Sequence, residues 1–264
     1  MAENSEYVRT TVGMMIHSEL ELAHQTRWNC IISGPPGIGK TTAIEKWRFP
    51  YGDQTLLITV PEPNRGKGHS PAQAMLLILE AIYGKYSCSI PRTSDSIILR
   101  NAAEHAIDRA FREQGYHRAD WRFTIVFDEA QGLSESALNA LRHWWDNADQ
   151  FFPEKVVFVF VGNDEFSMKV NSKGKSIISN ALKSRSLHPL TLTRADLSLE
   201  EVEAFIRAKG IEEKAVIREF VDYVKGNDDR RDFRTLTQLL DRCRTYTSGG
   251  PVTSDIARRA LKRR

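Results

Sequence analysis

Short apolar runs alternate with amphipathic stretches along the chain up to about residue 194. The runs are rich in β-branched and aromatic residues and are bounded by glycine, proline or polar residues, a pattern that predicts buried strands. Five strands are predicted in this way, at 28–33, 54–60, 121–127, 155–162 and 187–192.

Between these strands, apolar residues recur at the three- and four-residue spacing of a helix face. A proline suits the first turn of the helix that begins at residue 71, and Ser94 or Asp95 is placed to cap the next one, which ends near Gln114. Strands that alternate with helices predict an α/β fold, with a parallel sheet covered by helices on both faces. The predicted helices of this part are 7–26, 41–47, 71–83, the helix ending near 114, and 134–148.

After Arg194 the pattern changes, because four amphipathic helical segments follow one another with no strand pattern among them. We therefore predict three parts: an N-terminal helical segment at 1–27, an α/β nucleotide-binding part at 28–194, and a small all-helical part at 195–264. The first helix is expected to pack on the body of the protein or on a neighbouring subunit.

Composition favours a soluble globular protein, since 41% of the 264 residues are hydrophobic and 27% are charged. No apolar run approaches the roughly 20 residues that cross a bilayer, so no membrane partner is expected. The N-terminus does not resemble a secretory signal. Cys30, Cys88 and Cys243 lie far apart, which predicts free thiols in a reducing cytoplasm.

The net charge of +3 neither requires nor excludes nucleic acid. The chain ends in a basic segment, which is typical both of tails that touch nucleic acid and of a solvated helix end. Its cationic residues are Arg258, Arg259, Lys262, Arg263 and Arg264.

The clearest chemical motif is GPPGIGKTT at 34–42, which fits the pattern G-x-x-x-x-G-K-[ST] of a phosphate-binding loop. Only a glycine-rich backbone can curl its N–H groups around phosphates, and a following helix directs its positive end at the same anion. Lys40 is expected to reach the β- and γ-phosphates, and the Thr41 hydroxyl to bind Mg²⁺. The predicted ATP contacts are Gly34, Pro35, Pro36, Gly37, Ile38, Gly39, Lys40, Thr41 and Thr42.

Polar residues at the ends of the third and fourth predicted strands complete a candidate site. Asp128 and Glu129 follow the third strand, where Asp128 is expected to hold the metal and Glu129 to polarise the attacking water. Asn163 follows the fourth strand and is expected to hold that water, although a simple turn asparagine is the alternative.

The tryptophans and the histidines give weaker evidence of a functional site. Trp144 and Trp145 lie on an amphipathic helix, so core or subunit packing explains them better than base stacking. The seven histidines show no spacing typical of a metal site.

Taken in order, GPPGIGKTT, FTIVFDEAQ, VGNDEF, ALKSRSLHPLTL and DFRTLTQLL resemble the phosphate loop, acid pair, first sensor, arginine-finger region and second sensor of the AAA+ ATPases. The resemblance covers roughly 28–245. It implies a P-loop AAA+ fold with strand order 5-1-4-3-2, a helical lid, and ATP bound with Mg²⁺ between subunits.

The same resemblance suggests two arginines for the site. Arg185 matches the finger that reaches a neighbouring subunit's γ-phosphate, with Lys183 close by; a surface arginine paired with a local carboxylate is the alternative. Arg234 matches the second sensor on the lid, with Arg231 as a competitor.

Within that family, the size of the chain and FRTLTQLLDRC are similar to the regulators of DNA transposition, the phage Mu B protein and TnsC-type ATPases. This resemblance implies ATP-dependent assembly on double-stranded DNA as a ring or filament, and recruitment of a transposase. Arg65 and Lys67 in one loop, with Arg92 and Thr93 in another, are the predicted DNA contacts. Ordinary solvated loops are the alternative.

The resulting hypothesis is a protein whose subunits assemble when they bind ATP and come apart when the ATP is hydrolysed. One rival is an AAA+ ATPase that remodels or signals to a protein partner without touching DNA. A second rival is a binding module with little or no hydrolysis, although Glu129 argues against it.

Overall fold

The computed structural model describes residues 7–63, 68–86, 90–113, 115, 122–147, 156–168, 174, 176–247 and 250–262. It divides into two compact units. One comprises 17–33 and 44–191, and the other comprises 1–16, 34–43 and 192–264. The domain limits expected from the sequence stay a prediction.

The first of these units contains a five-stranded parallel sheet with the strand order β2-β3-β4-β1-β5. Read from the other edge, this is the predicted order 5-1-4-3-2, which is therefore confirmed. The strands are β1 (Cys30–Ser33), β2 (Thr55–Thr59), β3 (Phe123–Asp128), β4 (Val156–Gly162) and β5 (Leu190–Thr191). Every residue of β3 and β4 is buried, as expected for central strands covered on both faces.

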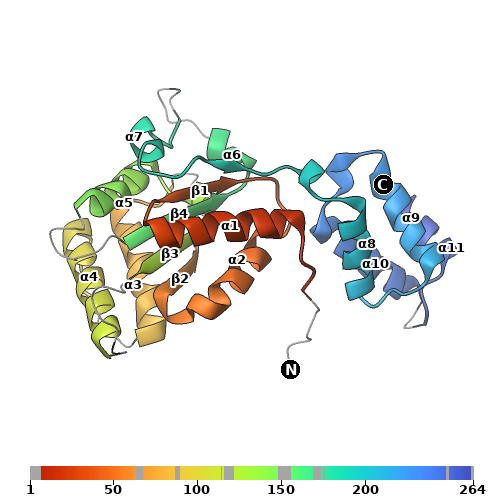
Figure 1. Cartoon of the computed structure of the whole chain (residues 1–264), viewed down its shortest axis with the longest axis horizontal. Helices are drawn as coiled ribbons and strands as arrows, with labels where there is room; N and C mark the ends of the chain where they lie inside the picture. Colours follow the sequence, from red (N-terminus) through yellow and green to blue (C-terminus); the bar gives the residue numbers. More distant parts are fainter. Residues whose placement is uncertain are drawn as a thin grey trace. The chain divides into compact units, whose positions relative to one another are not determined.

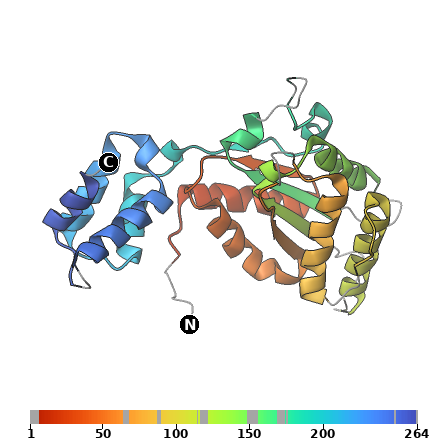
Figure 2. The same cartoon turned by 180° about the vertical axis from the view of Figure 1, so that it is seen from behind.

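Helices cover both faces of this sheet (Figures 1 and 2). One face, which carries Phe123, Ile125 and Phe127, packs against α3 (Pro71–Tyr86), α4 (Ser96–Glu113) and α5 (Glu135–Asn147). The other face carries Thr124, whose Oγ1 lies 2.9 Å from Nδ1 of His24 on α1 (Thr11–Thr26). The indole of Trp47 on α2 (Lys40–Arg48) packs edge-on against that imidazole.

Trp144 and Trp145 are buried, as predicted for core residues. The ring of Trp144 packs on Phe158, and Nε1 of Trp145 donates to the carbonyl oxygen of Arg27 at 3.2 Å. Cys30 and Cys243 are buried free thiols, also as predicted, whereas Cys88 lies outside the described residues.

Local chemistry shortened two predicted elements. The helix predicted to start at residue 7 begins at Thr11, because the Thr10 hydroxyl caps it by accepting from the Gly13 N–H at 3.0 Å. The strand predicted at 187–192 is reduced to β5, because Pro189 has no N–H with which to pair.

The remaining helices of the sheet-containing unit are short: α6 (Asp164–Met168) follows β4, and α7 (Asn180–Lys183) precedes β5. A 3-10 segment with a kink at Tyr51 occupies 49–54, and a single 3-10 turn occupies 130–132.

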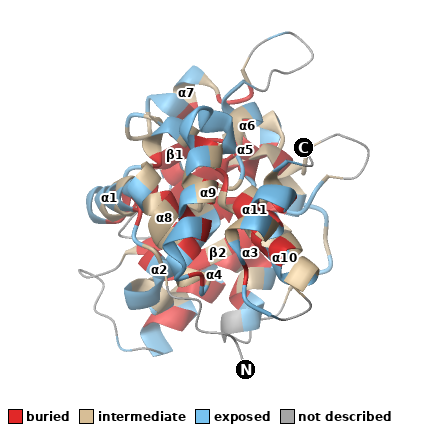
Figure 3. Cartoon of the chain, turned by 90° about the vertical axis from the view of Figure 1, so that its right-hand side faces the viewer, coloured by how far each residue is buried: buried red, intermediate tan, exposed pale blue. Residues whose placement is uncertain are grey.

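Among its described residues after 192, the other unit holds four α-helices, called here the C-terminal helices: α8 (Leu199–Ala208), α9 (Lys214–Lys225), α10 (Phe233–Thr247) and α11 (Ser254–Leu261). They form their own apolar core around Phe220, Leu236 and Leu240, and each helix shows stripes of buried and exposed residues (Figure 3). In the described part of 195–264 there is no strand, as predicted.

No helix in the part of the chain that the structure describes is long and apolar enough to cross a membrane.

Candidate functional site

The glycine-rich loop begins directly after Ser33, the last residue of β1, and ends where α2 begins at Lys40. Gly37 and Gly39 have φ values of +82° and +93°, which side chains rarely allow. At Gly34, a Cβ would lie 2.8 Å from Cβ of Leu192, so this position has no room for a larger residue. Gly37 and Gly39 are therefore required by the backbone path of the loop, and Gly34 by its close packing against Leu192.

Lys40 lies on the inner side of the loop that it follows. Its Nζ donates to the carbonyl oxygens of Gly34 at 2.7 Å and Pro35 at 2.9 Å. The ammonium group thus lies beside the first residues of the loop. It stands at the start of α2, whose first backbone N–H groups point toward the loop. This donor set and curled backbone fit a phosphate group, and the exposed Thr41 hydroxyl follows directly.

The start of α10 contacts this loop. The Phe233 N–H donates to the carbonyl oxygen of Gly37 at 2.9 Å, and the Asp232 carboxylate lies against the Gly37 Cα. Oδ1 of Asp232 also accepts from the backbone N–H groups of Arg234 and Thr235, which makes Asp232 the N-cap of α10. Asp232 was not among the residues predicted from the sequence, although an acidic residue just before a helical pattern is a recognisable cap signal.

Two predicted candidates for the second sensor differ in their surroundings. Arg231 donates to the carbonyl oxygen of Leu197 at 2.9 Å and pairs with Asp228 at 2.9 Å. Arg234 is exposed, and its guanidinium makes no hydrogen bond or ion pair with the residues that the structure describes. Arg231 is thus used to hold the C-terminal helices together, whereas Arg234 remains available for a ligand.

Asp128 and Glu129 end β3 in different environments. Asp128 is 3% exposed, and its Oδ1 accepts from the Glu129 N–H at 3.0 Å. Glu129 is exposed and adopts a left-handed conformation with φ 58° and ψ 40°, uncommon for a residue with a side chain. Such strain is often found at functional positions.

Asn163 follows β4, beside the end of β3 in the sheet. Its Oδ1 accepts from the Phe166 N–H at 3.2 Å and so caps α6. The side chain of Gln131 connects it to Glu129: Nε2 of Gln131 donates to Oε2 of Glu129, and Oε1 accepts from the Asn163 N–H at 3.3 Å. Gln131, which stands two residues after Glu129 in DEAQ, was not among the residues predicted from the sequence.

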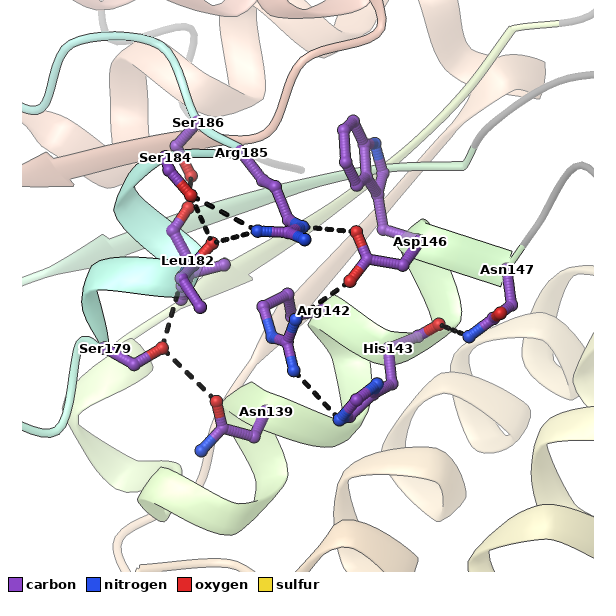
Figure 4. Close-up of polar contacts among 12 residues, drawn as sticks. Asn139, Arg142, His143, Asp146, Asn147, Ser179, Leu182, Ser184, Arg185 and Ser186 are labelled. Atoms are coloured by element: carbon purple, nitrogen blue, oxygen red, sulfur yellow. Dashed lines mark hydrogen bonds and ion pairs between the residues drawn. The ribbon is translucent and has the colours of Figure 1, made fainter.

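Arg185 lies just after α7 and pairs with Asp146 of α5 through its Nε (Figure 4). Its Nη1 donates to the carbonyl oxygen of Ala181 at 3.1 Å, and Arg142 binds the other carboxylate oxygen of Asp146 at 2.9 Å. This is the pairing expected of a surface arginine with a local carboxylate. The role of Arg185 as a finger toward a neighbouring subunit stays a prediction.

The predicted DNA contacts are only partly described. Arg65 and Lys67 lie outside the described residues. Arg92 is exposed. The Thr93 hydroxyl accepts from the Asp95 N–H at 3.1 Å, and Asp95 caps α4 by accepting from the Ile97 N–H at 2.8 Å.

Two arginines of the basic C-terminal segment have internal partners. Arg258 donates to Glu219 of α9 at 2.7 Å, and the Arg259 guanidinium lies over the ring of Tyr246 at 5.0 Å from its centroid. Lys262 is exposed, and Arg263 and Arg264 lie outside the described residues. In the described part of the chain, no group of three or more His, Cys, Asp or Glu residues is arranged to hold a metal ion.

Comparison with known proteins agrees with this geometry. The family model described as "AAA domain" matches residues 23–169. No curated protein sequence matches the chain.

Three similar solved structures share the fold at low sequence identity. Cdc6p from Pyrobaculum aerophilum has 15% identity and a TM-score of 0.61, over 97% of this chain and 68% of that chain. The Orc1 protein of Aeropyrum pernix, solved in complex with DNA, has 15% identity and a TM-score of 0.61, over 98% and 67%. Domain III of the Thermotoga maritima replication initiation protein DnaA has 18% identity and a TM-score of 0.53, over 97% and 93%.

Proposed function

Because the chain belongs to the AAA domain family, whose model covers more than half of it, we propose that it binds and hydrolyses ATP. The observation that carries this proposal is the loop at 34–39, whose positive-φ glycines curl it around the Lys40 ammonium at the start of α2. Glycines and a lysine at this spacing, between a buried strand and a helix, are typical of a phosphate-binding loop.

Residues of the loop and of two other segments would each bind a different part of the nucleotide and its metal ion. The backbone amides and Lys40 would hold the phosphates, and the Thr41 hydroxyl with the buried Asp128 carboxylate would hold Mg²⁺. Bound Mg²⁺ supplies positive charge that neutralises the phosphate oxygens during transfer. Arg234, exposed at the start of α10, would contact the same nucleotide.

Glu129 would act on the attacking water. Its carboxylate accepts the proton of the water as the water attacks, and Asn163 at the end of β4 helps to place that water. Arg185 from a neighbouring subunit would supply the remaining positive charge. Hydrolysis would then be slow while protomers are apart, since Arg185 of an isolated chain is paired with Asp146.

We further propose that ATP drives assembly of the chain on double-stranded DNA, as in the regulators of transposition that the sequence resembles, and that the assembled form recruits a transposase. Arg65, Lys67 and Arg92 would contact phosphates rather than bases, so binding would depend steeply on salt. Similarity to a structure solved with DNA, the Orc1 protein, supports a DNA-related role.

One observation favours the alternative of an ATPase that acts on a protein partner without DNA. The first amides of α4, next to Arg92 and Thr93, are already used by the Asp95 carboxylate. A negative charge at that helix end disfavours a phosphate there.

The decisive experiment measures fluorescence anisotropy of a labelled random duplex with ATP, ADP or no nucleotide, at stated salt. The proposal expects cooperative binding with ATP alone, and its loss in the double variant Arg65→Ala, Lys67→Ala. A matched control, Arg218→Ala with Lys214→Ala, removes the same charge from exposed positions on α9 and should bind like the parent.

Absence of binding in every state at low salt, with ATP hydrolysis intact, would refute the DNA proposal and favour the protein-directed alternative. Absence of both nucleotide binding and hydrolysis would refute the ATPase proposal itself.

A further inference from the structure

Gln131 lies between two residues proposed to act in hydrolysis. Its amide nitrogen Nε2 donates to Oε2 of Glu129, and its amide oxygen Oε1 accepts from the backbone N–H of Asn163 at 3.3 Å. One side chain therefore connects the end of β3 with the end of β4.

The orientation of this amide follows from its partners. A backbone N–H can only donate, so the end of Gln131 that meets Asn163 must be the oxygen. The opposite end is then the NH₂ group, and it faces the Glu129 carboxylate, which accepts. The hydrogen-bonding pattern leaves no second assignment of the amide.

The turn that carries Gln131 is firmly held. Ala130 and Gly132, its neighbours in the 3-10 turn, are buried, and the Gly132 N–H donates to the carbonyl oxygen of Glu129 at 2.9 Å. A Cβ at Gly132 would lie 2.7 Å from Cγ1 of Val60, which shows how closely the turn packs on the end of β2.

Gln131 is only partly buried, and with Glu129 and Asn163 it lines a groove of about 870 Å³ beside the ends of β3 and β4. A rigid turn thus presents a donor to a carboxylate that is otherwise exposed to solvent. Loss of such a hydrogen bond leaves an exposed glutamate free to sample several rotamers.

We propose that Gln131 is a positioning residue for hydrolysis: it holds the Glu129 carboxylate toward the water and ties its orientation to the end of β4. This inference rests on the proposed ATPase activity. Gln131 acts through Glu129 and does not itself exchange a proton with the water.

The test uses Gln131→Met, which preserves length and volume but removes both hydrogen bonds. Steady-state hydrolysis by the full chain should show kcat lowered by about tenfold or more, in line with the loss of a hydrogen bond to a charged group, with KM for ATP unchanged. Gln25→Ala is a matched control, because it removes a glutamine–glutamate hydrogen bond of the same kind, to Glu21 on α1. Its kcat should equal that of the parent chain.

A second measurement separates positioning from general damage. In the background Glu129→Gln, followed by single-turnover hydrolysis over hours, Gln131→Met should cause no further loss, because the group through which Gln131 acts has been removed. An unchanged kcat in Gln131→Met, or the same loss in both backgrounds, would overturn the inference. If the parent chain itself hydrolyses no ATP, the proposed function fails first, before any variant is compared.

Discussion

The contact between the phosphate loop and the start of α10 makes a quantitative prediction for Gly37→Ala. Gly37 has a φ of +82°, and a Cβ built there would lie 1.9 Å from Oδ1 and 2.5 Å from Cγ of Asp232. Either the loop or the Asp232 carboxylate must therefore move.

The size of the effect follows from what is lost. A left-handed conformation costs alanine about 1–2 kcal/mol. Displacing Asp232 sacrifices the cap of α10, worth about 0.5–2 kcal/mol, and the hydrogen bond from Phe233 to Gly37, worth about 0.5–1.5 kcal/mol. We expect Gly37→Ala to destabilise the loop and the first turn of α10 by about 2–5 kcal/mol.

A double-mutant cycle isolates the steric part. Asp232→Ala removes the carboxylate that the new methyl group meets. In that background, Gly37→Ala should lower the free energy of unfolding only by the cost of a left-handed alanine, about 1–2 kcal/mol. The free energy of unfolding of the parent, the two single variants and the double variant is measured by urea denaturation. Hydrogen exchange of the Arg234 and Thr235 amides, which Asp232 caps, reports on the first turn of α10. The predicted coupling energy is about 1–3 kcal/mol.

A second glycine provides a control for Gly37→Ala. Gly226→Ala introduces a methyl group where nothing lies within 4 Å and φ is −98°, so it should change stability by less than about 0.5 kcal/mol. Additive effects of Gly37→Ala and Asp232→Ala, within about 0.5 kcal/mol, would show that the two side chains do not meet in solution.

Three further predictions concern other parts of the chain. Burial lowers the pKa of His24, so the folded state binds fewer protons than the unfolded one, and stability should fall as pH drops below about 6.5. Below that pH, the urea midpoint of His24→Gln should depend less on pH than that of the parent. Arg234→Ala should weaken binding of a fluorescent ATP analogue with little change in melting temperature, whereas Arg231→Ala should mainly lower that temperature. Burial raises the pKa of the Cys30 thiol well above its usual range, so a thiol reagent should label it only when the protein unfolds; rapid labelling of the native chain would contradict this.

Much of the fold was predictable because its signals are local. Runs such as 121–127 and 155–162 are apolar throughout, and a buried parallel strand needs that composition whatever its neighbours are. The order of the strands was expected from the resemblance to AAA+ ATPases rather than from periodicity, and it is confirmed.

The phosphate loop was readable for a similar reason. Its conformation depends on glycine at particular positions and on a helix that starts at the lysine, all within about ten residues. The predicted roles of Asp128, Glu129 and Asn163 came from their places at strand ends, which chain order also reveals.

Contacts between residues distant in sequence could not be read in this way. Asp146 lies 39 residues from Arg185, and Asp232 lies far along the chain from Gly37; nothing in either local segment selects the partner. The same holds for Gln131 and the backbone of Asn163, 32 residues away.

By itself, then, the sequence determined which segments are strands and helices and that one loop is built for phosphate, because backbone conformation and burial pattern act over a few residues. Only the tertiary structure decided which carboxylate holds Arg185, which of Arg231 and Arg234 is left exposed, and which amide faces Glu129. Those choices depend on directional contacts between side chains that folding brings together, and the spacing of residues along the chain does not encode them.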